Sequence, residues 1–280
     1  MRVSEAVALL IQHKTERRFR PKYIKELNRV LIRFSQMSGN PMISDISPDS
    51  VERFIFSTDS PGGQQTTRAR LSALFTFAHR RKILHENPLS RVAECSRPVS
   101  KIPDILSPSQ CRQVMQFGLN SPRALAYLAL CLFVGLRPWE AMRTSWEDIR
   151  FEDSTLMVHG KNSKTRRHRI LELHPTAKLW LHEANARGSE LPIRPQPIRR
   201  TLRRLRLHLS LCKWPQDVLR HTCASYTLSL SNDFAKTAWQ LGNSEKILLR
   251  HYYRLAPKSD ATEFWSIAPD DSRQLELFRS

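Results

Sequence analysis

The residue types that could do chemistry are concentrated in three short segments of the second half of the chain. The segments read GLRPWEAMRTSWEDI, DVLRHTCASY and LGNSEKILLRHYYRL. Their reactive side chains are Arg137, Arg220, His221, Tyr252 and Tyr253. A guanidinium binds two phosphate oxygens with paired hydrogen bonds, which an ammonium does less well. A phenol, with a pKa of about 10, is a workable nucleophile and a good leaving group when the reaction reverses.

Taken together, the three segments resemble the conserved boxes of the tyrosine recombinase (phage integrase) family. In that family the first arginine lies in a G-L-R-x-x-E context, which residues 135–140 match. The second arginine lies in H-x-L-R-H-T, which residues 217–222 match except at the first position. The last box is L-G-H-S, and the nucleophilic tyrosine follows its histidine by nine residues. Residues 241–244 match that box apart from Asn243, and the same count ends at Tyr252.

The resemblance implies a reaction as well as a set of residues. Arg137 and Arg220 would clamp the phosphorane-like charge of a scissile phosphate, and Tyr252 would attack it to form a 3′-phosphotyrosine link. Bond energy stays in that link, so strands can be resealed without ATP, metal or any other cofactor. Neighbouring helical residues point about 100° apart, so only one of the two tyrosines can face the phosphate, and Tyr253 is expected to pack.

The family also uses a lysine from a hairpin between the two arginine boxes to give the leaving 5′-oxygen its proton. The segment HGKNSKTRRHRILEL offers Lys161 and Lys164. The Ser-Lys-Thr context and the distance to the next strand favour Lys164, which leaves Lys161 as a DNA contact. The alternative is that the whole turn is a basic loop that touches phosphates without chemistry.

Two positions that are usually histidine in the family differ here. Asn243 can still donate a hydrogen bond to a phosphate oxygen, without proton transfer. Asp217 is less suited to a phosphate because two anions repel. We expect it to orient Arg220 or to accept the tyrosine proton, and the alternative is that it has no chemical part. Glu140 is better placed to orient Arg137, three residues away, than to act as an acid.

The elements that must position these residues can be read from apolar spacing. Residues 3–92 show helical periodicity and predict a four-helix unit. The run from Ala124 to Leu136 predicts a buried helix, residues 145–174 predict short strands around a basic turn, and the remainder is helical. The fold class is therefore mostly α with a small β-sheet in the second domain (α+β).

The resemblance assigns functions to these regions. Residues 1–95 would form a helical core-binding domain, 96–108 a linker and 109–266 the catalytic domain. The two domains would form a clamp around DNA. Residues 267–280 would dock on a neighbouring protomer, and the alternative is a frayed terminus.

Charge supports a nucleic-acid partner. The 280 residues include 45 Lys+Arg and 26 Asp+Glu, a formal net charge of +19, and 40% are hydrophobic. A folded protein with such an excess favours a polyanion. Candidate DNA-contacting arginines lie in two helical segments, although each could also belong to a solvated helix surface. They are Arg68, Arg70, Arg199, Arg200 and Arg203.

Several classes of protein are excluded or disfavoured. The N-terminus lacks a signal-peptide pattern, and the longest apolar run is too short to cross a bilayer. Five cysteines without CxxC spacing argue against a disulfide framework or structural zinc. We therefore expect a cytoplasmic, nucleoid-associated protein with no membrane partner. The resemblance implies double-stranded DNA as partner, a homotetramer on two duplexes in the synapse, and a monomer or dimer off DNA.

Two rivals to a site-specific recombinase or integrase of a mobile element remain. One is a catalytically impaired DNA-binding protein on the same scaffold, which the two missing histidines favour. The other is a type IB topoisomerase, which shares the chemistry. The helical N-terminal half and the short length favour the recombinase.

Overall fold

The computed structural model of the protein describes residues 1–96, 103–160, 168–252 and 256–269, the side chains of 250–252 excepted. The chain divides into two compact units, Met1–Val99 and Ser100–Ser280. Each unit has its own hydrophobic core. In the described part of the chain, no helix is both long and apolar enough to cross a membrane.

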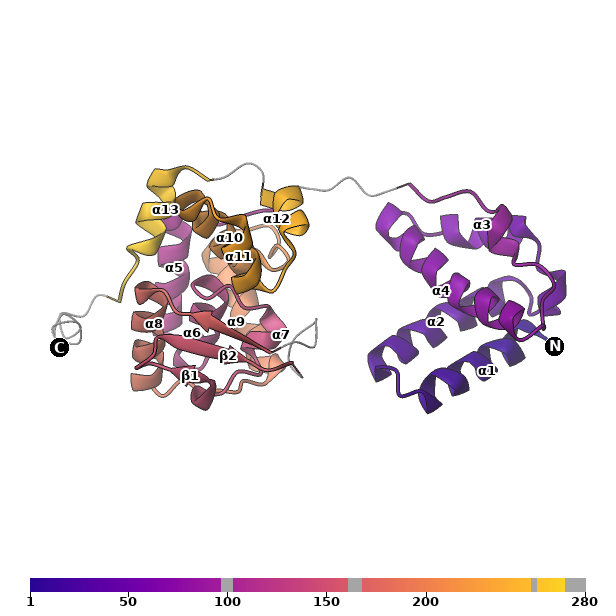
Figure 1. Ribbon diagram of the computed structural model, residues 1–280, viewed down its shortest axis with the longest axis horizontal. Helices are drawn as coiled ribbons and strands as arrows, with labels where there is room; N and C mark the ends of the chain where they lie inside the picture. Colours follow the sequence, from indigo (N-terminus) through magenta and orange to yellow (C-terminus); the bar gives the residue numbers. More distant parts are fainter. Residues whose placement is uncertain (97–102, 161–167, 253–255, 270–280) are drawn as a thin grey trace. The chain divides into compact units, whose positions relative to one another are not determined.

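The first unit consists of the four helices that the apolar spacing predicts (Figure 1). They are α1 (Val3–Glu16), α2 (Pro21–Met37), α3 (Pro48–Phe56) and α4 (Pro61–Arg80), with 3₁₀ turns at Ile43–Asp45 and Pro88–Arg91. Helix α1 packs on α2 and α4, and α3 packs on α4. Phe34 lies at the centre, with its ring 5.1 Å from that of Phe54 and 5.9 Å from that of Phe75, both edge to face.

The second unit is built around a central helix that is buried on every side (Figure 1). Its helices are α5 (Pro108–Leu119), α6 (Pro122–Leu132), α7 (Pro138–Ala141), α8 (Pro175–Ala186), α9 (Pro195–His208), α10 (Val218–Ser231), α11 (Phe234–Leu241), α12 (Glu245–Tyr252) and α13 (Lys258–Trp265). Every residue of α6 from Ala124 to Leu132 is buried, and α5, α8 and α10 pack against it. A helix that is apolar all round can only be a core helix, as its sequence predicts.

A small antiparallel sheet with strand order β1-β2-β3 lies in the same unit, after a 3₁₀ turn at Trp146–Asp148. The strands are β1 (Ile149–Arg150), β2 (Thr155–Val158) and β3 (Arg169–Glu172). Leu156 pairs with Leu171 and Val158 with Arg169, and all four side chains are buried. The sheet therefore has one buried face. Together with the helices it confirms the predicted mostly helical fold with a small sheet.

Prolines begin most of the helices. In the described part of the chain, eight α-helices start on a proline, where the missing N–H is not needed and φ is already helical. These residues are Pro21, Pro48, Pro61, Pro108, Pro122, Pro138, Pro175 and Pro195. Eight of the 17 prolines of the sequence thus mark where an α-helix begins.

Part of the stretch that the sequence predicts as linker belongs to the second unit. Leu106 is buried, its backbone N donates to Thr222 Oγ1 at 2.9 Å, and its carbonyl accepts from Tyr226 Oη at 2.9 Å. Residues 103–106 are therefore held against α10. Of the predicted linker, residues 97–102 lie outside the described residues.

Candidate active site

Arg137 is positioned by a tight turn after α6 and by the first turn of α7. Gly135 has φ +71°, a conformation that favours glycine. A Cβ at this position would lie 2.6 Å from Leu241 Cδ2 and 3.1 Å from Cys223 Sγ, so the backbone approaches α10 and α11 as only glycine allows. Arg137 then caps α7, and its backbone N donates to Glu140 Oε2 at 3.1 Å. Its side chain is 21% exposed.

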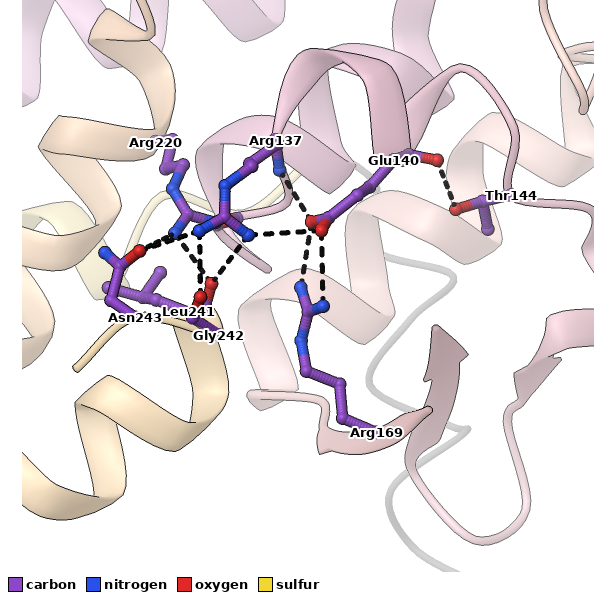
Figure 2. A network of polar contacts seen from close by, with 9 residues as sticks. Arg137, Glu140, Thr144, Arg169, Arg220, Leu241, Gly242 and Asn243 are labelled. Atoms are coloured by element: carbon purple, nitrogen blue, oxygen red, sulfur yellow. Dashed lines mark hydrogen bonds and ion pairs between the residues drawn. The ribbon is translucent and has the colours of Figure 1, made fainter. Parts of the chain in front are cut away.

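Arg220 enters the same place from the first turn of α10, where it is buried (Figure 2). Its Nη1 donates to the carbonyl of Gly135 at 2.7 Å, and its Nη2 donates to the carbonyl of Leu241 at 2.6 Å. The turn at Gly135 therefore orients both guanidinium groups. Arg137 follows this turn in the chain, and Arg220 donates to the Gly135 carbonyl.

Asn243 joins the two guanidinium groups. It follows Gly242, which ends α11 in a left-handed conformation with φ +61°. Its Oδ1 accepts from Arg137 Nη2 at 2.7 Å and from Arg220 Nη2 at 3.1 Å. The sequence predicts this amide as a phosphate donor. In the structure its oxygen accepts from both arginines, which leaves Nδ2 as the part of the amide that can donate.

Carbonyl groups of the turn complete the surroundings of Arg137. Nη2 donates to the Gly242 carbonyl at 2.8 Å, and Nη1 reaches the Leu241 carbonyl at 3.5 Å (Figure 2). A phosphate that enters this site must therefore replace neutral acceptors on the guanidinium. A phosphate oxygen carries a negative charge and a carbonyl oxygen does not, so the guanidinium attracts the phosphate more strongly than it attracts these carbonyls.

Glu140 holds Arg137 from the opposite side and is itself held by a third arginine. Its side chain is 2% exposed and lies 3.2 Å from Arg137 Nη1. Arg169, on β3, donates to Oε1 at 3.2 Å and to Oε2 at 2.8 Å. Burial alone would raise the pKa of this carboxyl, but the hydrogen bonds and charges of Arg169 and the charge of Arg137 hold the pKa below its ordinary value. Glu140 is therefore an ionised orienting group, as the sequence predicts.

Arg169 is the participant that the sequence interpretation missed. It lies in the predicted strand HRILEL, on the same face as Leu171, and both are buried. The signal that could have identified it is an arginine at a position that alternation assigns to the apolar face of this strand. Such a side chain needs a buried partner of opposite charge. Which carboxylate it meets depends on tertiary packing.

The remaining catalytic candidates are less fully described. Asp217 begins α10 in a left-handed conformation with φ +52° and lines a cavity of about 130 Å³ that Arg220 also lines. Its chemical role stays a prediction. Tyr252 is the last residue of α12, and its side chain is not among those described. Lys161 and Lys164 lie outside the described residues. The described residues hold no group of three His, Cys, Asp or Glu side chains suited to a metal ion.

The candidate DNA-contacting arginines of α9 are exposed, whereas those of α4 are half-buried. Arg199, Arg200 and Arg203 are exposed on α9, whose Ile198 and Leu205 are buried. Ordinary amphipathic packing thus presents the α9 arginines to solvent.

The two arginines of α4 are engaged inside the first unit. Arg68 donates to the carbonyls of Ala93, Val92 and Leu89, and Arg70 lies over the ring of Tyr23 at 4.7 Å. These hydrogen bonds hold Arg68 against residues 89–93, and its assignment as a phosphate contact stays a prediction.

Five other basic residues of the first unit line a cavity of about 530 Å³ formed by α1 and the C-terminal part of α4. We call it the α1–α4 cleft. Its basic lining residues are His13, Lys14, Arg17, Arg80 and Arg81. The ammonium of Lys14 lies 4.2 Å from the Phe19 ring centroid, and the guanidinium of Arg81 lies 4.9 Å from that of Phe77.

The chain is similar in sequence and in fold to known proteins. A sequence model of the group described as "Phage integrase family" matches residues 104–259. A "Tyrosine recombinase" of Pseudothermotoga lettingae is 26% identical over 217 residues, which covers 72% of this chain and 76% of that protein. "Tyrosine recombinase XerC" of Lactobacillus delbrueckii subsp. bulgaricus is 26% identical over 165 residues, and the match spans 55% of each chain.

Among solved structures, the fold is similar to that of a lambda integrase(75–356) dimer bound to a COC′ core site. The TM-score is 0.72 at 17% identity, with 88% of this chain and 97% of that chain covered. Another similar fold is that of XerH site-specific recombinase bound to a palindromic difH substrate, with a TM-score of 0.66 at 14% identity over 83% of this chain and 76% of that chain.

Proposed function

The chain belongs to the phage integrase family of tyrosine recombinases, and we propose that it is a site-specific DNA recombinase that acts through a covalent 3′-phosphotyrosine intermediate. The observation that carries the proposal is the meeting of Arg137, Arg220 and Asn243 at one point. These residues come from three segments far apart in the sequence. Two guanidinium groups on one amide oxygen form a preorganised clamp for an anion with several oxygens.

The proposed reaction balances within the chain's own residues and DNA. The phenolic oxygen of Tyr252 attacks the scissile phosphorus, a new P–O bond forms, and the bond to the 5′-oxygen breaks. The charge that gathers on the non-bridging oxygens is stabilised by Arg137 and Arg220. Lys164 gives the departing 5′-oxygen its proton, and Asp217 is a candidate acceptor for the phenolic proton. Attack by a 5′-hydroxyl on the phosphotyrosine reverses these steps and reseals a strand.

The proposed partner is double-stranded DNA. The net charge of +19, the exposed α9 arginines and the α1–α4 cleft support it. We assign residues 1–95 to core binding and 109–266 to catalysis, and we propose a homotetramer on two duplexes as the active assembly. One similar fold is a lambda integrase tetramer bound to a Holliday junction, with a TM-score of 0.70 at 16% identity over 87% of this chain. Residues 267–280 are proposed to dock on a neighbour, and 270–280 lie outside the described residues.

A nicked suicide duplex tests the proposal. The duplex is built from inverted repeats that flank the coding region, so that the cleaved fragment diffuses away and traps the protein on DNA. The wild type is expected to form a covalent adduct that survives denaturation. Tyr252→Phe must abolish the adduct, and the matched variant Tyr253→Phe must retain it. An adduct that survives in Tyr252→Phe contradicts the assignment of the nucleophile.

One observation favours a second candidate function. The family positions that are usually histidine are Asp217 and Asn243 here, and Asn243 has no proton to transfer. A DNA-binding protein without strand cleavage would fit these changes. A wild type that binds its repeats tightly and forms no adduct on any nicked version of them supports this candidate over the recombinase.

A further inference from the structure

Arg169 occupies a position that stability alone explains poorly. Its side chain is 6% exposed, and its Nε is buried without a hydrogen bond to any described residue. A buried ion pair often contributes no more stability than an apolar pair of the same volume. An arginine kept here at the cost of an unsatisfied donor therefore points to a function at the neighbouring site.

Its partner is also the partner of Arg137. Glu140 carries one negative charge and faces two guanidinium groups, and Arg169 contacts both of its oxygens whereas the Arg137 guanidinium contacts one (Figure 2). Without Arg169, the buried carboxylate would have Arg137 as its nearest cation. The pair would then be neutral, and Arg137 would attract a phosphate less strongly.

Arg169 also lies directly beneath the turn that carries Asn243. A Cβ at Gly242 would meet the Arg169 guanidinium at 3.1 Å from Cζ and 3.2 Å from Nε and Nη1. The carbonyl of the same glycine accepts from Arg137. One side chain therefore contacts both the carboxylate that orients Arg137 and the turn that joins Arg137 to Arg220.

We propose that Arg169 is a positioning residue that takes up the charge of Glu140, so that Arg137 remains a cation available to a phosphate. The inference rests on the proposed function, because the phosphate of interest is the scissile one. Arg169 does not touch that phosphate, and its effect passes through Glu140 and the turn at Gly242.

The test is a double-mutant cycle in the full-length protein. Arg169→Met is expected to lower the single-turnover rate of adduct formation about 10²-fold, the scale of losing one preorganised electrostatic group. DNA affinity in a gel shift should change less than about threefold, because the groups on the DNA-contacting surface are intact. Arg169→Lys keeps the charge and should retain more of the rate than Arg169→Met.

The decisive variant is Arg169→Met combined with Glu140→Gln. Removal of the uncompensated carboxylate should make the double variant at least about tenfold faster than Arg169→Met. Two independent structural defects would not produce such a recovery. The matched control is Arg187→Met with Glu183→Gln, an ion pair on α8 away from the described cluster, which should leave the rate unchanged. A double variant no faster than Arg169→Met overturns the inference.

A second measurement separates this inference from the proposed function. The Nε–H resonance of Arg137 is followed by NMR during titration with inorganic phosphate. We expect a shift in the wild type, a response at least about tenfold weaker in Arg169→Met, and recovery in the double variant. If the wild type forms no adduct and these responses hold, the recombinase proposal fails and the inference stands. A wild-type Arg137 that does not respond to phosphate, or an equal response in Arg169→Met, overturns the inference.

Discussion

The two units treat polar groups in opposite ways. Among the described residues of the first unit, the buried polar side chains are Ser35 and Thr67, and none is charged. Its lysines and arginines are exposed or half-buried, and several of them lie over aromatic rings. In the second unit, the described residues that are both polar and buried are Glu140, Thr144, Arg169, Thr176, Ser189, Arg220, Thr222, Ser225, Ser229 and Thr237.

This difference indicates a division of labour. A surface of cations on an apolar core can bind a polyanion without a fixed geometry, and each charge contributes a small, salt-dependent share. Buried charges are costly and are tolerated where every partner is placed, so they mark a site that must hold one arrangement. Each single substitution of a cation in the first unit should therefore change the affinity for DNA only slightly. Substitutions in the buried cluster should change chemistry and stability abruptly.

The largest expected effect comes from Arg220. Arg220→Met removes one of the two guanidinium groups, leaves the Gly135 carbonyl without its side-chain donor and takes the shorter of two hydrogen bonds from the Leu241 carbonyl. We expect the rate of adduct formation to fall about 10³-fold. Single-turnover cleavage of the suicide duplex at saturating protein measures this. The control from the other unit is Arg81→Met, which should cleave at the wild-type rate once the DNA is saturated. Comparable rates for the two variants would remove the proposed division of labour.

Glu140→Gln should destabilise the second unit by about 3 kcal/mol at pH 7, because it leaves the buried Arg169 without a counter-charge. The sign of the pH dependence follows from the pKa. The pKa of the Glu140 carboxyl in the folded protein is below its ordinary 4.5, so the ionised group stabilises the fold above that pH. The contribution is lost as the pH falls through the folded pKa. The difference in the free energy of unfolding between wild type and Glu140→Gln should therefore become smaller as the pH falls.

Tryptophan fluorescence during urea unfolding measures this effect in the second unit alone, because all six tryptophans lie there. These residues are Trp139, Trp146, Trp180, Trp214, Trp239 and Trp265. Glu172→Gln, which removes an exposed pair with Lys236 in the same unit, is the control and should change stability by less than about 0.5 kcal/mol. A gap between Glu140→Gln and wild type that stays constant from pH 7 to about pH 3 would contradict the ionised, paired state of Glu140.

Gly135→Ala tests the close approach that builds the cluster. The substitution combines a strained positive φ with contacts of 2.6 Å and 3.1 Å to Leu241 and Cys223. We expect a loss of about 2–3 kcal/mol in the second unit, from backbone strain and overpacking together. Gly188→Ala is the matched control, because Gly188 has φ +70° and no described atom within 4 Å of its Cβ position. Equal losses in the two variants would show that the packing around Gly135 is loose.

Sequence alone was sufficient for what depends on local pattern. Helices, the small sheet and the buried α6 follow from apolar periodicity and from prolines at helix starts, and these predictions are confirmed. The resemblance also singled out Arg137, Arg220 and Asn243, which the structure brings together. Motif order could not show that Asn243 accepts from both arginines, because that depends on how the end of α11 packs against the turn at Gly135.

What the sequence could not supply are pairings between distant elements. Arg169 meets Glu140 only because β3 packs beside α7, and the two residues are 29 positions apart. The sequence around Arg68 looks like that of any exposed helical arginine, yet its guanidinium donates to carbonyls 21 to 25 residues away. Likewise, the α1–α4 cleft combines cations from both ends of the first unit. Charge and periodicity cannot distinguish these cases, since each depends on tertiary geometry.

The smallest expected effects separate two arginines that look alike in sequence. Arg81, in the α1–α4 cleft, is exposed, and its guanidinium lies over Phe77. Arg81→Gln should reduce the slope of log affinity against log salt by about 0.9, the share of one phosphate contact, and should leave the melting temperature unchanged. Because each contact is worth little, the loss of affinity at physiological salt should be less than about tenfold.

Arg68→Gln should give the opposite signature. Its guanidinium donates to the carbonyls of Leu89, Val92 and Ala93, so the loss should lower the melting temperature of the first unit and leave the salt slope unchanged. Filter binding over a salt series and circular dichroism melting of both variants measure the two quantities. If the slope of log affinity against log salt falls in Arg68→Gln and stays constant in Arg81→Gln, Arg68 on α4 is the DNA contact and Arg81 is not. The cations of the first unit would then have to reach DNA from a face other than the α1–α4 cleft.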